Sequence, residues 1–210
     1  MPQTNGRIPQ TDDLLDEFLK FDALGLKKEA KQIVLAIIDT VPSLDAKTVW
    51  TQNNLDRLPL NCSSQIRHEI YESIVFPVLK AEFSRDEPDA SYLLGKHWQN
   101  LVTMRSLSEQ MDHRSATDFF RIAFELEPSS VRYRHAYLTS LINDLDFTFH
   151  EWPTGILIDH TNWQEDMQRL KEQLSLADSL DKDGRFSADL AVWVEASQQY
   201  ETRLAEQRWS

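Results

Sequence analysis

Glycine and cysteine are scarce in this chain, with 5 Gly and 1 Cys among 210 residues. A low glycine content disfavours folds built on tight hairpin turns and favours long helices. No Gly-rich phosphate loop, Rossmann fingerprint or Gly-x-Ser-x-Gly nucleophile motif occurs, which removes the commonest sequence signs of an enzyme. Because Cys62 is the single cysteine, no disulfide can form within the chain, and a reducing compartment is expected.

Long apolar runs and an excess of basic side chains are also lacking. No segment approaches roughly 18 uninterrupted apolar residues, and the first residues lack the apolar core of a signal peptide, so we expect a cytoplasmic protein without membrane contact. The 34 acidic and 22 basic side chains give a net charge of −12, which disfavours a nucleic-acid partner. Residues 151–210 carry half of this net charge, which suits a protein partner, a basic one in particular.

Apolar residues recur at spacings of three and four through most of the chain. This period predicts an all-α fold, an irregular helical bundle of about eight helices. We expect a flexible terminus over residues 1–10, a helical domain over 11–145 and an irregular connection over 146–160. Residues 161–210 hold two apolar stripes separated by a turn at 181–184, which predicts an antiparallel helix hairpin packed on the same domain.

Several residues predict where helices begin, bend or end within 11–145. Pro77 lies inside an apolar stripe that starts near Ser63 or Ser64, so we expect a kinked helix there. Asp86 before Pro88 is typical of an N-cap, and the helix that follows should run to about residue 110. Two further starts are predicted by capping residues, namely Ser115 with Asp118, and Ser129 or Ser130.

One segment resembles a known repeat. The spacing typical of the second helix of a tetratricopeptide repeat is found in Ala116, Phe120, Ala123 and Pro128. Trp98 and Leu101 lie three apart in the preceding helix, as the large apolar pair of that family does. Residues 88–128, extended at most to 145, therefore resemble one tetratricopeptide-repeat hairpin. Val102 stands where a small residue is usual, and no regular array at a period of about 34 residues is visible.

The resemblance implies protein binding by the inner face of each first helix. It places Lys96, Gln99 and Thr103 on that face, followed by Tyr133 and Tyr137 in a degenerate second copy. The two tyrosines also fit a core position, because aromatic residues at helical spacing usually face the core. The basic pair that grips a C-terminal carboxylate in some family members is not recognisable, so the resemblance implies no ligand class.

Two further groups are candidates for contact with a partner. Trp152 lies in the irregular connection with other aromatic residues, where it would act as an interface anchor or would fill a groove of the protein itself. Glu165, Asp166 and Glu172 form an acidic face on the first helix of the C-terminal hairpin, suited to a basic partner.

Residues that could carry chemistry are few. His150, Glu151, Asp159 and His160 could in principle supply nitrogen and oxygen ligands to a metal, yet their spacing fits no zinc signature. The segment from Ser179 to Leu190 resembles a calcium loop but lacks its closing carboxylate, so a helix-joining turn is the better interpretation. We therefore predict no catalytic residue, no metal and no cofactor.

The sequence thus favours an acidic, all-helical interaction module that binds a protein or peptide without catalysis. A sharper alternative is an immunity or antitoxin protein that neutralises a basic toxin. A further alternative is a metal-dependent enzyme with a site around His150 and His160.

Overall fold

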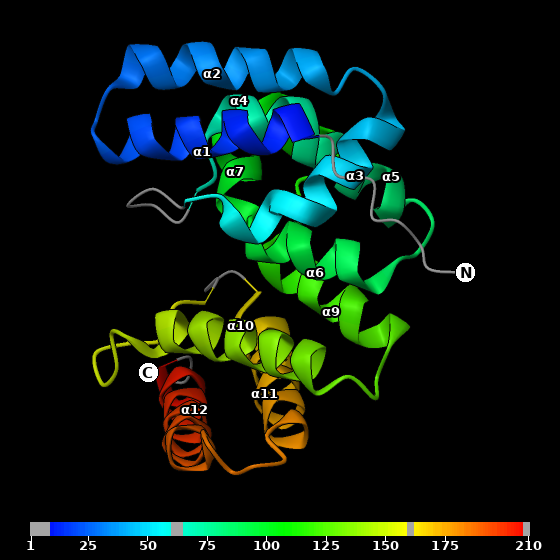
Figure 1. Cartoon of the computed structure of the whole chain (residues 1–210). Helices are drawn as coiled ribbons and strands as arrows, with labels where there is room; N and C mark the ends of the chain where they lie inside the picture. Colours follow the sequence, from blue (N-terminus) through cyan, green and yellow to red (C-terminus); the bar gives the residue numbers. More distant parts are fainter. Residues whose placement is uncertain (1–8, 60–64, 159–161, 208–210) are drawn as a thin grey trace. The chain divides into compact units, whose positions relative to one another are not determined.

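The computed structural model describes residues 9–59, 65–158 and 162–207. Of these residues 77% are helical, and no strand occurs among them. The predicted all-α fold is confirmed (Figure 1). Residues 1–8 of the expected flexible terminus lie outside the described ranges, as do Ser63 and Ser64, whereas Pro9 already begins the first helix.

Contacts between residues divide the chain into two compact units, Met1–Phe119 and Phe120–Ser210, here called unit 1 and unit 2. The division falls within helix α9 (Ala116–Leu126). Residues Tyr137 to Leu145 share a buried core with the two C-terminal helices. An apolar stripe in the sequence predicts that a helix is buried but not which neighbouring helix buries it.

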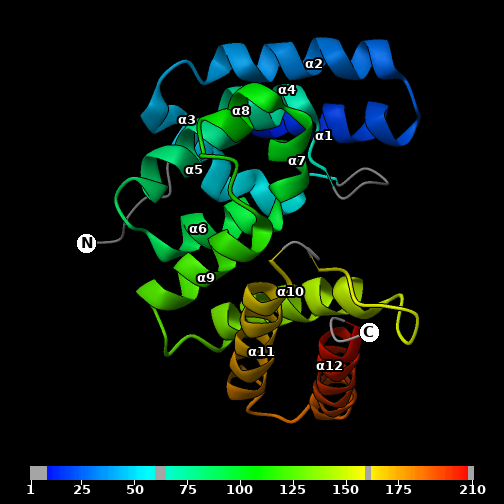
Figure 2. The ribbon, with the colours of Figure 1, turned by 180° about the vertical axis from the view of Figure 1, so that it is seen from behind.

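Unit 1 starts with a helix hairpin formed by α1 (Pro9–Ala23) and α2 (Lys27–Thr40). The two helices lie side by side in Figures 1 and 2. Gly25 has φ +70° in the turn between them, a backbone conformation that glycine adopts without steric cost. The unit continues with α3 (Leu44–Asn54), η1 (Leu55–Arg57), α4 (His68–Ile70), η2 (Tyr71–Val75), α5 (Phe76–Phe83), α6 (Pro88–Lys96), α7 (Trp98–Thr103) and α8 (Arg105–Glu109).

The disturbance predicted at Pro77 takes the form of a π-helical turn. Helices α4, η2 and α5 follow one another without a gap, and η2, Tyr71–Val75, is π-helical. Proline has no backbone N–H and its ring crowds the carbonyl four residues earlier, here that of Ser73. A wider turn just before the proline accommodates that crowding.

The single helix predicted from residue 88 to about 110 is wrong, because it is interrupted at His97 and Met104. Asn100 gives a physical reason. Its buried side chain accepts a hydrogen bond from the Ile66 amide at 3.0 Å and donates one to the Ile66 carbonyl at 2.6 Å. This long-range pairing fixes α7 separately from its neighbours. The predicted N-cap is also shifted, since Glu87 holds that position and Asp86 has φ +58°.

The capping box at the start of α9 is confirmed. The Asp118 amide donates to the Ser115 hydroxyl oxygen at 3.1 Å, and the Ser115 amide donates to the Asp118 carboxylate at 3.0 Å. Of the two predicted caps for the next helix, Ser130 is the one used, accepting from the Tyr133 amide. Helix α10 (Val131–Phe149) runs further than expected, so residues 146–149 of the predicted connection are helical.

Unit 2 ends in the predicted antiparallel hairpin of α11 (Trp163–Leu180) and α12 (Ser187–Gln207), which is visible in both ribbon views. Asp181 organises the turn between them, because its carboxylate oxygens accept from the amides of Arg185 at 3.0 Å and Phe186 at 2.8 Å. Gly184 supplies the positive φ, +66°. The core of this unit is built from α10, α11 and α12 together with Ile156.

Candidate functional site

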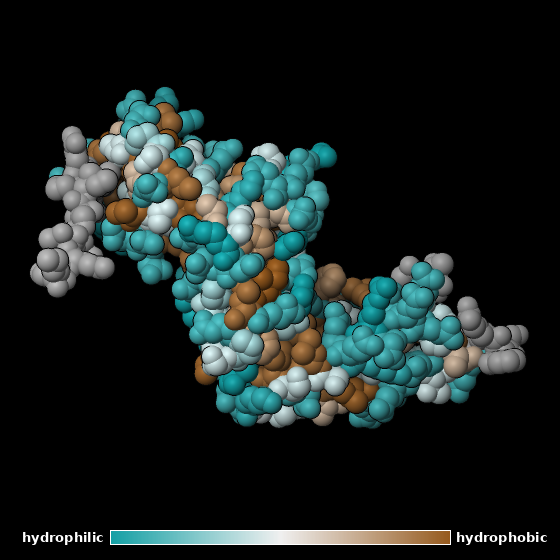
Figure 3. Space-filling view, turned by 90° about the vertical axis from the view of Figure 1, so that its right-hand side faces the viewer, coloured by the Kyte–Doolittle hydropathy of each residue, from teal (hydrophilic) through white to brown (hydrophobic). Residues whose placement is uncertain are grey.

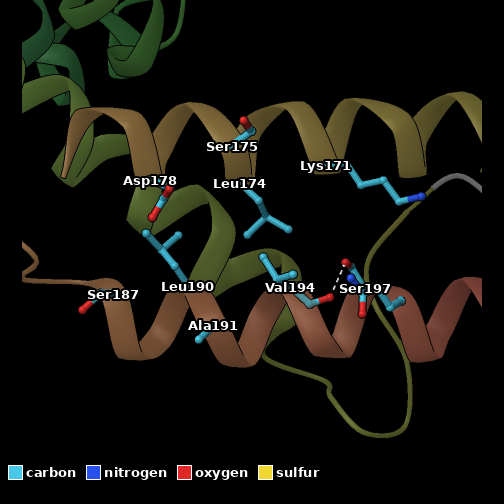
Figure 4. A pocket seen from close by; sticks show the side chains of 10 residues that line it. Lys171, Leu174, Ser175, Asp178, Ser187, Leu190, Ala191, Val194 and Ser197 are labelled. Carbon is cyan, nitrogen blue, oxygen red and sulfur yellow. Dashed lines mark hydrogen bonds between the residues drawn. The ribbon is translucent and has the colours of Figure 1, made fainter.

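A groove runs between α11 and α12 in unit 2 and holds a volume of about 500 Å³ (Figure 4). Its two walls, α11 and α12, are joined by the turn that the Asp181 carboxylate organises. The residues that line it are Lys171, Leu174, Ser175, Asp178, Ser187, Leu190, Ala191, Val194, Ser197 and Gln198.

The floor of this groove is apolar. Leu174 and Leu190 are each 3% exposed and also belong to the core of unit 2, so the floor is the outer side of that core. Val194 is 40% exposed on the α12 wall. The Ser197 hydroxyl donates to the Val194 carbonyl at 2.8 Å, so it is already satisfied within α12. The groove therefore has an apolar floor, and polar side chains such as Ser175, Ser187 and Gln198 also line it.

The charge around the groove is acidic. Among the described residues, Lys171 is the one basic side chain that lines it, and its ammonium nitrogen lies 2.8 and 2.7 Å from the two carboxylate oxygens of Glu201. That pair is neutral overall. Asp178 lines the groove and is exposed. Glu172 and Glu195 follow lining positions on the two helices, and their carboxylates accept hydrogen bonds from the side-chain amides of Gln168 and Gln199.

The three residues of the predicted acidic face on α11 differ in their surroundings. The Glu165 and Asp166 carboxylates lie 4.0 and 3.5 Å from the Arg169 guanidinium, which offsets part of their charge. Asp166 and Arg169 line a second hollow of about 380 Å³ with Thr148, Leu157, Ile158, Leu170 and Gln173. Glu172 is exposed beside the groove, so it is the predicted acidic residue best placed for a partner there.

The candidates from the repeat resemblance on unit 1 lie on two different helices. Lys96 ends α6, and its ammonium nitrogen lies 3.9 Å from Asp56. Gln99 and Thr103 are exposed on α7, where the Gln65 side chain donates to the Gln99 carbonyl at 2.9 Å and to the Thr103 hydroxyl at 3.0 Å. These bonds tie both residues to the segment that precedes α4.

The aromatic candidates are largely buried, and Tyr137 belongs to the core of unit 2. Tyr133 and Tyr137 are each 5% exposed, which favours the core role weighed for them above. Trp152 packs against the same core, with the Arg203 guanidinium carbon 4.7 Å from the centre of its ring. Arg203 also donates to the Pro153 carbonyl at 3.1 Å. Phe147 is the aromatic residue of this region that stays exposed, at 67%.

The metal hypothesis receives no geometric support from the described part of the chain. His150 and Glu151 form a pair at 2.8 Å, but no group of three or more potential ligands occurs within residues 9–59, 65–158 and 162–207. Asp159, His160 and Cys62 lie outside those ranges. In the calcium-like segment, both oxygens of Asp181 accept backbone amides, as expected of a helix-joining turn.

Unit 1 contains buried polar side chains that the sequence analysis did not single out. His97 is 3% exposed, and neither ring nitrogen has a hydrogen-bond partner. Burial, with a smaller effect of Lys96, lowers the pKa of His97 to about 4, while Asp56 opposes the shift. Its ring lies 6.4 Å from that of Tyr71, whose pKa burial raises. A lone histidine in a helical segment gives no sequence signal of this burial.

The α11–α12 groove was not predicted from the sequence, although the apolar pattern of α12 contains a sign of it. Leu190 belongs to the main apolar stripe of α12, whereas Ala191 and Val194 lie beside that stripe at a spacing of three. A second, adjacent apolar stripe on a surface helix indicates that the helix has two neighbours. Because α11 lies opposite this second stripe, the stripe lines a groove between the two helices.

Comparisons with family models, with characterised proteins and with solved structures find no match for this chain. The resemblance of residues 88–128 to a tetratricopeptide repeat thus rests on those residues alone. Among the helices described here, none is long and apolar enough to span a bilayer. The face shown in Figure 3 is mostly hydrophilic, with hydrophobic residues gathered in separate patches.

Proposed function

We propose that this chain is a protein-binding module without catalytic activity, and that the α11–α12 groove is where it binds its partner. The observation that carries the proposal is an apolar groove in an acidic surround, with Leu174, Leu190 and Val194 as its apolar surface. Grooves between helices are a common place for ligands to bind in helical proteins.

Each part of the groove has a distinct role in binding. Covering apolar surface such as the exposed side of Val194 supplies free energy, at about 25 cal/mol for each Å² removed from water. The carboxylates of Glu172, Asp178 and Glu195 attract a basic partner, which raises the association rate and excludes acidic competitors. A basic partner is also what an immunity or antitoxin protein neutralises, so that role is a sharper form of the same proposal.

The proposal is tested by quantitative affinity capture with the full chain as bait in a lysate of its source organism. Val194→Asp places a charge in the groove, whereas Val192→Asp is the matched control because Val192 is 58% exposed and does not line the groove. We expect a captured protein whose recovery falls about tenfold with Val194→Asp, equivalent to about 1.4 kcal/mol, and stays unchanged with Val192→Asp.

Circular dichroism of both variants checks that the helices remain intact. If Val194→Asp retains every captured protein at the level of the unmodified chain, the groove is not the binding site and the proposal is wrong.

A further inference from the structure

We propose that the occupant of the α11–α12 groove is an amphipathic helix of about three turns, with basic residues on both sides of its apolar stripe. This inference rests on the proposed function and specifies the chemistry of the partner. It follows from the length of the groove, the state of its backbone groups and its charge.

The length of the groove sets the length of the occupant. Lining residues extend from Ser187 to Gln198 on α12 and from Lys171 to Asp178 on α11. At 1.5 Å per helical residue these spans are about 16 Å and about 10 Å. A docked helix of about 11 residues, or three turns, covers the longer wall.

The walls of the groove favour a helix over an extended strand. Both walls are α-helical, so their backbone groups are engaged within α11 and α12. An extended peptide binds mainly through main-chain hydrogen bonds to a sheet edge, and these walls offer none. A helix satisfies its own backbone and needs only an apolar stripe to match Leu174, Leu190 and Val194.

The architecture of unit 2 points the same way. Helices α10, α11 and α12 already share one core. Leu174 and Leu190 belong to that core and also form the floor of the groove. A helix laid between α11 and α12 would become a fourth helix packed on this unit. Packing of antiparallel helices around shared apolar residues is the common arrangement of four-helix bundles.

The charges select a basic helix. Glu201 neutralises Lys171, the single basic lining residue. Asp178 lines the groove on α11, and Glu172 and Glu195 are next in sequence to lining residues of α11 and α12. No ion pair is found for these three carboxylates among the described residues. Lysine or arginine on each side of the apolar stripe would face these carboxylates, whereas an acidic helix of the same apolar pattern would be repelled.

The test uses the full chain and three fluorescein-labelled synthetic peptides of about 14 residues. The first has leucine at alternating spacings of three and four, flanked by lysine and arginine. The second has the same composition in scrambled order, and the third replaces the basic residues with glutamate. Fluorescence anisotropy measures binding as sodium chloride is raised.

We expect the first peptide to bind about tenfold or more tightly than either control, and to bind less tightly as salt increases. Val194→Asp should weaken its binding about tenfold, while Val192→Asp changes it less than about twofold. Difference circular dichroism should show a gain of helix in the bound peptide.

Equal binding of the scrambled peptide, equal effects of the two substitutions, or a bound peptide without added helix would each overturn the inference. Failure of the inference is distinguishable from failure of the proposed function. If capture of a cellular protein depends on Val194 but no basic helical peptide binds, the groove is a protein site with a different occupant.

Discussion

His97 shows how one residue can couple the stability of this protein to pH. It is buried in unit 1 without a hydrogen-bond partner for either ring nitrogen. Charging a buried imidazole costs solvation energy, and for this reason its pKa falls from 6.5 to about 4. Between these two values the unfolded chain binds a proton at His97 that the folded chain does not bind.

We predict that the contribution of His97 to the free energy of unfolding is fully present above about pH 6.5 and is lost as the pH falls toward 4. Between pH 7 and pH 5 the expected loss is about 2 kcal/mol. The variant His97→Leu cannot be protonated, so this part of the loss should be absent in it. Urea unfolding at the two pH values measures the difference.

His68→Gln is the control for this prediction, because the His68 side chain is 67% exposed. The control should keep the acid sensitivity of the unmodified chain. A His97→Leu protein as sensitive to pH 5 as the unmodified one would show that His97 is not the responsible group.

At the scale of helices, a local capping signal predicted where α9 begins, whereas the breaks between α6, α7 and α8 accompany tertiary contacts. Ser115 with Asp118 predicted the start of α9 because a capping box is a contact between neighbours in sequence. The interruptions at His97 and Met104 could not be predicted in this way. They accompany a pairing of Asn100 with Ile66, and those residues are 34 positions apart in the sequence.

Removing the Ser115 hydroxyl should destabilise the protein through the start of α9. Ser115→Ala loses the acceptor for the Asp118 amide and the donor to the Asp118 carboxylate at 2.8 Å. We expect the free energy of unfolding to fall by about 1 kcal/mol, measured by urea denaturation at pH 7. Ser106→Ala, at an exposed position on α8, should change it by less than about 0.5 kcal/mol. Equal effects of the two substitutions would contradict the capping role.

At the scale of the whole molecule, the predicted all-α fold has a direct spectroscopic consequence. With 77% of the described residues helical, far-ultraviolet circular dichroism should show strong minima near 208 and 222 nm and a helical content well above half. The value should persist in the Val194→Asp and Val192→Asp proteins, since both positions are exposed. A spectrum dominated by strand would contradict the architecture on which the groove depends.

The candidate site could be predicted only in part at this scale. The acid excess of the last 60 residues and the apolar stripes of the C-terminal hairpin were evident, and Glu172 was named as a contact residue. The groove itself was not, because Ala191 and Val194 become its wall only when α11 lies opposite them. The repeat resemblance placed Tyr133 and Tyr137 on a binding face, whereas in the structure each is only 5% exposed.

The sequence by itself determined the helical class, the caps of α9 and α10 and the C-terminal hairpin, because these depend on residues close together in the sequence. It also determined the net charge of −12, on which the proposal of a basic partner rests. Only the tertiary structure decided that α10 shares a core with α11 and α12, that α7 is separate from α6, and that His97 is buried. The physical reason is that each of these features depends on which helices meet, and helical periodicity marks a face for burial without naming its neighbour.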